Sequence, residues 1–231
     1  MNQPVDPEGK WLYRWGGVSA IAIGIGYLVV IGLYVPIGAP PSGAEARLAY
    51  VAAHPTTWWA ILGLSVFTDF LFVPMALALY LALKGINRGA MLLASACVGL
   101  FVVLDLALTW TNYEALITLS GQYAAAASDA QKAAAVAAAV YPSAVLESRL
   151  LFVYNSLTLA LGILMTGFVM LTGIFSRWTA YLGVATGILG IISVAGPYLV
   201  SALGMTIILT SILTTVWVLV VGYRLCGLGR E

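Results

Sequence analysis

Two aspartates are the residues of this sequence whose type and position point most directly to chemistry. Asp69 and Asp105 are the single charged residues of two apolar runs, residues 59–83 and 90–113. Two carboxyl groups that meet in an apolar environment cannot easily both ionise, so a close pair is expected to hold a proton or a cation. Such a pair suits proton-coupled transport or acid–base chemistry.

The spacing of the two aspartates predicts that they meet. A short basic turn, residues 84–88, joins the two apolar runs. If both runs are helices, each aspartate lies about 21 to 23 Å from that turn, at 1.5 Å per residue. Helices joined by so short a turn are usually neighbours. We therefore expect both carboxyl groups to face the bundle interior and to interact directly or through one water.

Other polar residues share the predicted faces of these helices. Positions i+4 and i+7 after Asp105, and i−4 before Asp69, lie on the same side as the aspartates, and a further polar pair opens a later apolar run. The candidate ligand- or proton-binding residues are Asp69, Asp105, Ser65, Thr109, Asn112, Tyr154 and Asn155. In the alternative interpretation, each aspartate is a structural clamp bonded to a polar side chain of another helix.

The composition indicates whether the protein lies in water or in a membrane. Of 231 residues, 62% are hydrophobic and 8% are charged, whereas soluble domains contain about 25% charged residues. The protein is therefore expected to lie in the lipid bilayer. Its formal net charge of +1, without a basic stripe, argues against nucleic acid as a partner.

Six apolar stretches are long enough to cross a hydrocarbon core of roughly 30 Å. The uncharged stretch 178–223 is too long for one crossing, so we expect a turn at Gly196 and Pro197, because proline interrupts a helix. Gly183 and Gly187 form a GxxxG packing face. The fold class predicted is all-α, a polytopic six-transmembrane-helix bundle with short extracytoplasmic helices, in a single integral membrane domain over residues 1–231. The predicted spans are residues 16–37, 59–83, 90–113, 150–175, 178–195 and 202–223.

The two longest predicted loops, residues 38–58 and 114–149, each contain a capping box, which opens a helix. One box, Ser42 with Glu45, predicts a short helix that ends before Pro55. The other, Ser128 with Gln131, predicts a surface helix over residues 129–140 that stops at Pro142.

Basic residues predict the orientation. An amino terminus in the cytoplasm puts seven of the ten lysines and arginines inside and both long loops outside, which agrees with the positive-inside rule. The inner set is Lys10, Arg14, Lys84, Arg88, Arg177, Arg224 and Arg230. Both termini are then cytoplasmic.

Several short motifs suggest a family. They are a basic start before Trp15, the short helix up to His54, the Tyr154 and Asn155 pair, and Ser176 to Trp178 followed by Leu182 and Gly183. In these places the chain resembles uncharacterised bacterial six-helix integral membrane proteins, domain-of-unknown-function family 4386. The resemblance implies the fold and a location in the bacterial cytoplasmic (inner) membrane, and it carries no assigned reaction.

Residue types exclude several familiar membrane chemistries. A retinal Schiff base needs a lysine within a span, and none is present; a haem held by two histidines needs more than His54. Zinc hydrolases use several histidines with carboxylates, and thiol oxidoreductases need cysteines spaced more closely than Cys97 and Cys226. We predict no metal site and leave the cofactor unknown.

Three functions remain open. The first is small-molecule or ion binding or transport through an outward-facing polar pocket at Asp69 and Asp105. The alternative is a structural or accessory subunit that binds partner helices, lipid or pigment, or a second copy of the chain. The last is an intramembrane enzyme, which ranks lowest because no nucleophile or metal cluster accompanies the aspartates. A threonine stripe, Thr206, Thr210 and Thr214, is interpreted as helix packing with hydroxyls bonded to carbonyls.

Overall fold

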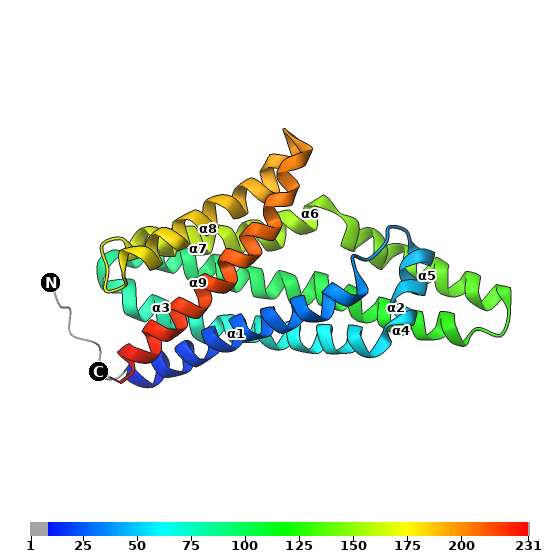
Figure 1. Ribbon diagram of the computed structural model, residues 1–231, viewed down its shortest axis with the longest axis horizontal. Helices are drawn as coiled ribbons and strands as arrows, with labels where there is room; N and C mark the ends of the chain where they lie inside the picture. Colours follow the sequence, from blue (N-terminus) through cyan, green and yellow to red (C-terminus); the bar gives the residue numbers. More distant parts are fainter. Residues whose placement is uncertain (1–8, 231) are drawn as a thin grey trace.

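The computed structural model describes residues 9–230, which are almost entirely helical and contain no strand. Figure 1 shows an elongated bundle in which most helices run along the long axis. The α-helices are α1 (Lys10–Ile37), α2 (Ala44–Ala53), α3 (Pro55–Leu104), α4 (Thr111–Ala125), α5 (Asp129–Glu147), α6 (Arg149–Phe152), α7 (Thr158–Met170), α8 (Arg177–Ala195) and α9 (Thr206–Leu228). Two π-helical turns and two 3₁₀ turns connect some of them: Asp105–Trp110, Val153–Leu157, Gly196–Tyr198 and Ser201–Met205.

Within residues 9–230, five helical segments are long and apolar enough to cross a membrane. The prediction of an all-helical membrane protein is therefore confirmed at this level. The segments are Lys10–Ile37, Pro55–Ala125, Arg149–Met170, Arg177–Tyr198 and Ser201–Leu228.

The segment Pro55–Ala125 is a helical hairpin. Its backbone leaves helical geometry at Asn87, where φ is −149° and ψ is 92°, and the two arms run back along each other in Figure 1. The Asn87 side chain accepts a hydrogen bond from the backbone N–H of Ala90 at 3.0 Å, which caps the returning arm. Asp69 precedes Asn87 by as many residues as Asp105 follows it, so the hairpin preserves the matched heights expected from the sequence.

Glycines allow neighbouring helices to approach closely. A Cβ atom built on Gly167 of α7 would lie 2.7 Å from the backbone nitrogen of Val184 in α8, and one on Gly187 would lie 2.5 Å from the Cβ of Leu164. The GxxxG face of α8 thus packs against α7 of the same chain. Side chains this small let helices gain van der Waals contact in lipid, where no hydrophobic effect drives association.

The first and last helices cross at a similar contact. A Cβ atom on Gly17 of α1 would lie 2.9 Å from the carbonyl oxygen of Gly222 in α9. Beyond this crossing the two helices diverge, as Figure 1 shows.

Helices α2, α4 and α5 form a small unit at one end of the bundle, which we call the cap. Leu48, Leu116 and Ala139 are buried between these helices. Arg47, only 6% exposed, forms an ion pair with Glu147 at 3.2 Å and donates a hydrogen bond to the carbonyl oxygen of Ser143. The cap therefore joins the two predicted loops into one packed structure.

The cap corrects two predicted boundaries. Helix α4 continues to Ala125, so the third apolar run does not give way to a loop after residue 113. Helix α5 runs through Pro142 to Glu147, so the predicted stop is wrong. Proline removes one hydrogen bond from a helix, but Pro142 is buried within the cap, and that packing keeps the helix intact.

One of the two predicted capping boxes is present. The hydroxyl of Ser128 accepts a hydrogen bond from the N–H of Gln131, and the Gln131 side chain accepts one from Ala127. The box predicted at Ser42 is absent, because α2 begins after Gly43, whose φ is 88°. The Gly43 N–H donates to the Glu147 carboxylate at 2.9 Å, so a contact from α5 replaces the local cap.

The later boundaries shift by several residues. The fourth predicted span, 150–175, is helical only to Met170. Helix α8 ends at Ala195 and a 3₁₀ turn follows at Gly196, so the predicted turn at Gly196 and Pro197 is confirmed. Helix α9 begins at Thr206 and ends at Leu228, later than residues 202 and 223. The two termini themselves lie outside the described residues.

Candidate functional site

The two aspartates lie together inside the bundle. Asp69 is 3% exposed and Asp105 is 8% exposed, and they lie close enough for the charge of one carboxyl group to influence the other. Both face the interior, as their matched heights predict. None of the partners described for the two carboxyl groups is basic.

The first π turn, Asp105–Trp110, sets the partner of Asp69. A π turn holds an extra residue compared with an α turn, so the side chains that follow it rotate to a new face. Trp110 consequently reaches across the hairpin, and its indole N–H donates to the Asp69 carboxylate at 2.8 Å. Asn112, which regular α-helical spacing would put on the Asp105 face, donates instead to the carbonyl of Leu108 in its own helix.

The second π turn, Val153–Leu157, supplies the partner of Asp105. Asn155 lies within this turn, and its amide N–H groups donate to the Asp105 carboxylate and to the hydroxyl of Thr109. Its amide oxygen is buried and has no hydrogen-bond partner. π turns occur frequently at functional sites, and here both of them lie at the carboxyl pair.

The structure brings four of the seven candidate residues together: Asp69, Asp105, Thr109 and Asn155. Ser65 is buried one turn from Asp69, and its carbonyl oxygen accepts a hydrogen bond from Thr68. Tyr154 is 36% exposed although it is adjacent to Asn155.

A series of aromatic rings connects the carboxyl pair with the cap. Trp110 lies 5.6 Å from Tyr113, and Tyr113 stacks on Trp58 at 5.1 Å. The Trp58 ring also contacts Tyr50 of α2 at 5.9 Å. The donor to Asp69 is thus packed into the same aromatic cluster that supports the cap.

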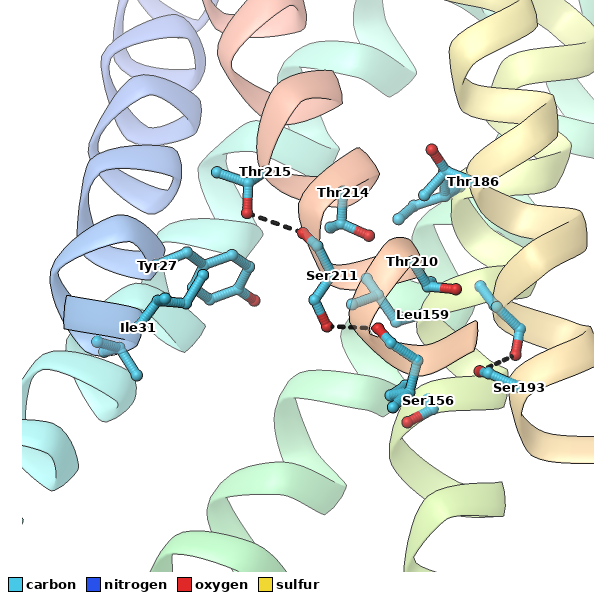
Figure 2. A pocket seen from close by; sticks show the side chains of 15 residues that line it. Tyr27, Ile31, Ser156, Leu159, Thr186, Ser193, Thr210, Ser211, Thr214 and Thr215 are labelled. Carbon is cyan, nitrogen blue, oxygen red and sulfur yellow. Dashed lines mark hydrogen bonds between the residues drawn. The ribbon is translucent and has the colours of Figure 1, made fainter. Parts of the chain in front are cut away.

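A cavity of about 260 Å³ lies between α1, α7, α8 and α9. Figure 2 shows hydroxyl side chains from three sides of it, with Tyr27 of α1 opposite Ser211 and Thr214 of α9. The ring of Tyr27 lies 6.3 Å from that of Phe72, which follows Asp69 by three residues in α3. This side chain therefore connects the wall of the cavity with the helix that carries Asp69.

A second cavity, of about 170 Å³, lies on the side of the pair that faces the cap. Thr109 and Asn155 line it together with Leu146 of α5. Ser156 borders both cavities, so the residue next to Asn155 in the second π turn separates one from the other. Among residues 9–230, no group of three or more histidine, cysteine or acidic side chains is arranged to hold a metal ion.

Sequence reasoning missed three residues of this region: Trp110, Tyr27 and Ser156. Trp110 is found only once the π turn is known, since regular helical spacing assigns it to another face. Tyr27 had a usable signal, because a tyrosine in the middle of an apolar span must find a partner for its hydroxyl. Ser156 gave no signal beyond its place next to Asn155.

The apolar helical segments and the buried polar centre define a helical membrane protein. The chain belongs to the family described as a domain of unknown function (DUF4386), whose model matches residues 11–225. The resemblance seen in the sequence motifs is thus confirmed. No curated protein and no solved structure matches the chain.

Proposed function

We propose that this protein binds or transports a small molecule or cation in the membrane, with Asp69 and Asp105 as its proton- or cation-binding centre. The single observation that carries the proposal is a pair of buried carboxyl groups on the two arms of one hairpin, whose hydrogen-bond donors, Trp110 and Asn155, are both uncharged. Like charges in a low-dielectric interior disfavour a doubly ionised state. The pair therefore needs a proton or a bound cation.

The surroundings of the pair support exchange with a ligand. The amide oxygen of Asn155 is buried and has no hydrogen-bond donor. A buried polar group without a partner lowers the stability of the folded protein by about 1–3 kcal/mol, so a ligand that donates to this oxygen would be stabilised. The 170 Å³ cavity, which Asn155 lines, provides space for that donor. A cation that approaches the pair favours release of the shared proton, and by linkage the proton opposes the cation.

The proposal includes a membrane arrangement of six crossings in a single domain. At 1.5 Å per residue the 71-residue segment Pro55–Ala125 would be about 106 Å long, so each arm of its hairpin crosses separately. The turn at Asn87, the α7–α8 connection and the end of α9 lie at one end of the bundle, opposite the cap (Figure 1). Basic residues favour this end as the cytoplasmic one. The membrane is then the inner membrane of a bacterium, and the cap lies outside it.

Infrared spectroscopy of the full chain in nanodiscs tests the proposal. If the carboxyl groups share a proton, a protonated-carboxyl band should persist at neutral pH and disappear as the pH rises. Asp69→Asn should change the pH at which Asp105 loses its proton, and Asp105→Asn should do the same for Asp69, because each change removes the coupled charge. Glu114→Gln, at an exposed carboxylate, is the matched control and should leave the band unchanged.

Two results would contradict this function. One is a wild-type spectrum, recorded without added metal or ammonium cations, in which no protonated-carboxyl band remains at neutral pH. The other is that the remaining aspartate loses its proton at the same pH as in wild type when its partner aspartate is replaced. Either result would favour the structural-clamp interpretation and an accessory role in the membrane.

A further inference from the structure

We propose that the 260 Å³ cavity between α1, α7, α8 and α9 binds an amphiphilic ammonium cation that enters from the bilayer. This inference rests on the proposed function and names the ligand class of the same polar centre. It is carried by the position of the cavity mouth, the hydrogen-bonding character of the lining, the nearby carboxyl groups and the cavity volume.

The cavity opens on the side of the bundle. Helices α1 and α9 touch at Gly17 and Gly222 and then diverge (Figure 1), and residues of their later parts line the cavity. Ile31 of α1 and Ser211 of α9 line the cavity and are also exposed on the surface. Their neighbour Ile208 is 61% exposed, so the rim of the mouth is apolar. A ligand that reaches this mouth comes from the hydrocarbon region of the bilayer.

The lining accepts hydrogen bonds more readily than it donates them. The hydroxyls of Thr210, Ser211 and Thr215 each donate to a carbonyl oxygen of their own helix at 2.9 Å. Thr186 and Ser193 of α8 do the same. A hydroxyl has one donor and two acceptor lone pairs, so its use as a donor leaves acceptors free. Such a wall suits a ligand rich in N–H groups and disfavours an anion.

The charge of the nearby aspartates also favours a cation over an anion. Tyr27 lines the cavity, and its ring is held 6.3 Å from that of Phe72, one turn after Asp69 in α3. A cation in the cavity would be attracted both by the negative charge that the carboxyl pair carries and by the face of an aromatic ring. The acidic centre and the acceptor-rich wall thus favour an ammonium group.

The size and the apolar part of the lining define the rest of the ligand. Leu159 and Ile163 of α7 and Ile207 of α9 provide apolar surface. An apolar cavity of about 150 Å³ holds one benzene molecule, so 260 Å³ accommodates on the order of ten non-hydrogen atoms by the same scale. The ligand is therefore an ammonium group on one short aryl or alkyl body.

The test uses 2-phenylethylammonium and its neutral isostere 2-phenylethanol as probes. Binding to the full chain in nanodiscs is measured by ligand-observed NMR, with empty nanodiscs subtracted. We expect the cation to bind at least about tenfold more tightly than the alcohol, which corresponds to about 1.4 kcal/mol. Ser211→Phe should fill the cavity mouth and weaken cation binding at least about tenfold, whereas Ile212→Phe, one residue away on the exposed face, should leave it unchanged.

A second variant tests the effect of a polar group on binding without changing the volume of the cavity. Tyr27→Phe keeps the ring beside Phe72 and removes only the hydroxyl, so it should weaken cation binding about threefold, roughly 0.7 kcal/mol. Equal binding of the alcohol and the ammonium ion would overturn the choice of a cation and point to a neutral lipid-like ligand. Equal effects of Ser211→Phe and Ile212→Phe would overturn the choice of cavity.

The outcome also distinguishes this inference from the proposed function. If the carboxyl pair titrates as a coupled unit but the ammonium probe does not bind, the inference fails and the proposed function stands. If the probe binds in the cavity with the same affinity in wild type, Asp69→Asn and Asp105→Asn, the proposed coupling to the aspartates fails.

Discussion

Two polar regions of this bundle are held together in different ways. At the carboxyl pair, side chains form hydrogen bonds between helices, as Trp110 does with Asp69 and Asn155 with Asp105. Along α7 and α8, hydroxyls bond within their own helix; Thr166 donates to the carbonyl of Gly162 and Thr186 to that of Leu182. The helices of this second region meet through glycines instead.

The difference follows from what each group needs in an apolar medium. A hydroxyl can donate to a carbonyl one turn earlier, so it requires nothing from a neighbouring helix. An aspartate cannot be satisfied in this way, because its carboxylate only accepts hydrogen bonds when ionised. Donors must then come from elsewhere, and the two helical segments that provide them, Asp105–Trp110 and Val153–Leu157, are both π-helical. The carboxyl pair is therefore associated with irregular helices, and the glycine contact with regular ones.

The largest effect should come from breaking the glycine contact. Gly167→Leu would push a side chain into the backbone of α8, since even a Cβ atom there lies 2.7 Å from the nitrogen of Val184. We expect loss of the folded protein, measured as the yield of the monodisperse peak in size-exclusion chromatography. Gly63→Leu is the control, because a Cβ at Gly63 has no neighbour within 4 Å. Equal yields would show that close glycine packing does not hold this region.

An intermediate effect should follow from removing the donor to Asp105. Asn155→Leu deletes the hydrogen bonds to Asp105 and Thr109 and leaves a buried carboxyl group without its donor. We expect a loss of about 2 kcal/mol in the free energy of unfolding, the usual scale for such a group. Reversible unfolding in mixed micelles gives the value, with Tyr154→Phe as the neighbouring control. A stability equal to that of wild type would indicate that the Asn155 contact is replaceable.

The smallest effect is expected for a hydroxyl that bonds within its own helix. Thr210→Val removes the bond from Thr210 to the carbonyl of Thr206 and keeps the shape of the side chain. Because that carbonyl is also a backbone acceptor within the helix, we expect a change below about 0.5 kcal/mol. The same unfolding assay measures it. A loss as large as that of Asn155→Leu would erase the distinction between the two regions.

The sequence predicted the carboxyl pair because the rise of a helix is regular. Equal spacing of Asp69 and Asp105 from one turn was enough to match their heights. The face of the helix on which each residue lies was less predictable. Thr109 lies beside Asp105 as expected, but Asn112 does not, because the intervening π turn rotates the residues after it to another face. A single sequence gave no sign of that turn, and Trp110 was missed for the same reason.

The fold shows the same division between local and distant causes. Long apolar runs and the turn at Gly196 were readable from composition and from Pro197. Local rules predicted that Pro142 ends a helix and that Ser42 caps one. Neither prediction holds in the cap, where α5 continues through Pro142 and α2 begins after Gly43. There Arg47 and Glu147 connect helices distant in sequence, and these contacts outweigh the local preferences.

Tight packing of α1 fixes one wall of the cavity. A Cβ atom on Gly24 would lie 2.5 Å from the Leu219 side chain of α9, and one on Gly26 would lie 2.5 Å from Thr68 of α3. Tyr27 follows these two glycines directly, so its ring is carried by a helix that is held closely on two sides. A side chain larger than hydrogen at either glycine would push α1 away from a neighbour and move Tyr27 with it, which would change the width of the cavity that Tyr27 lines.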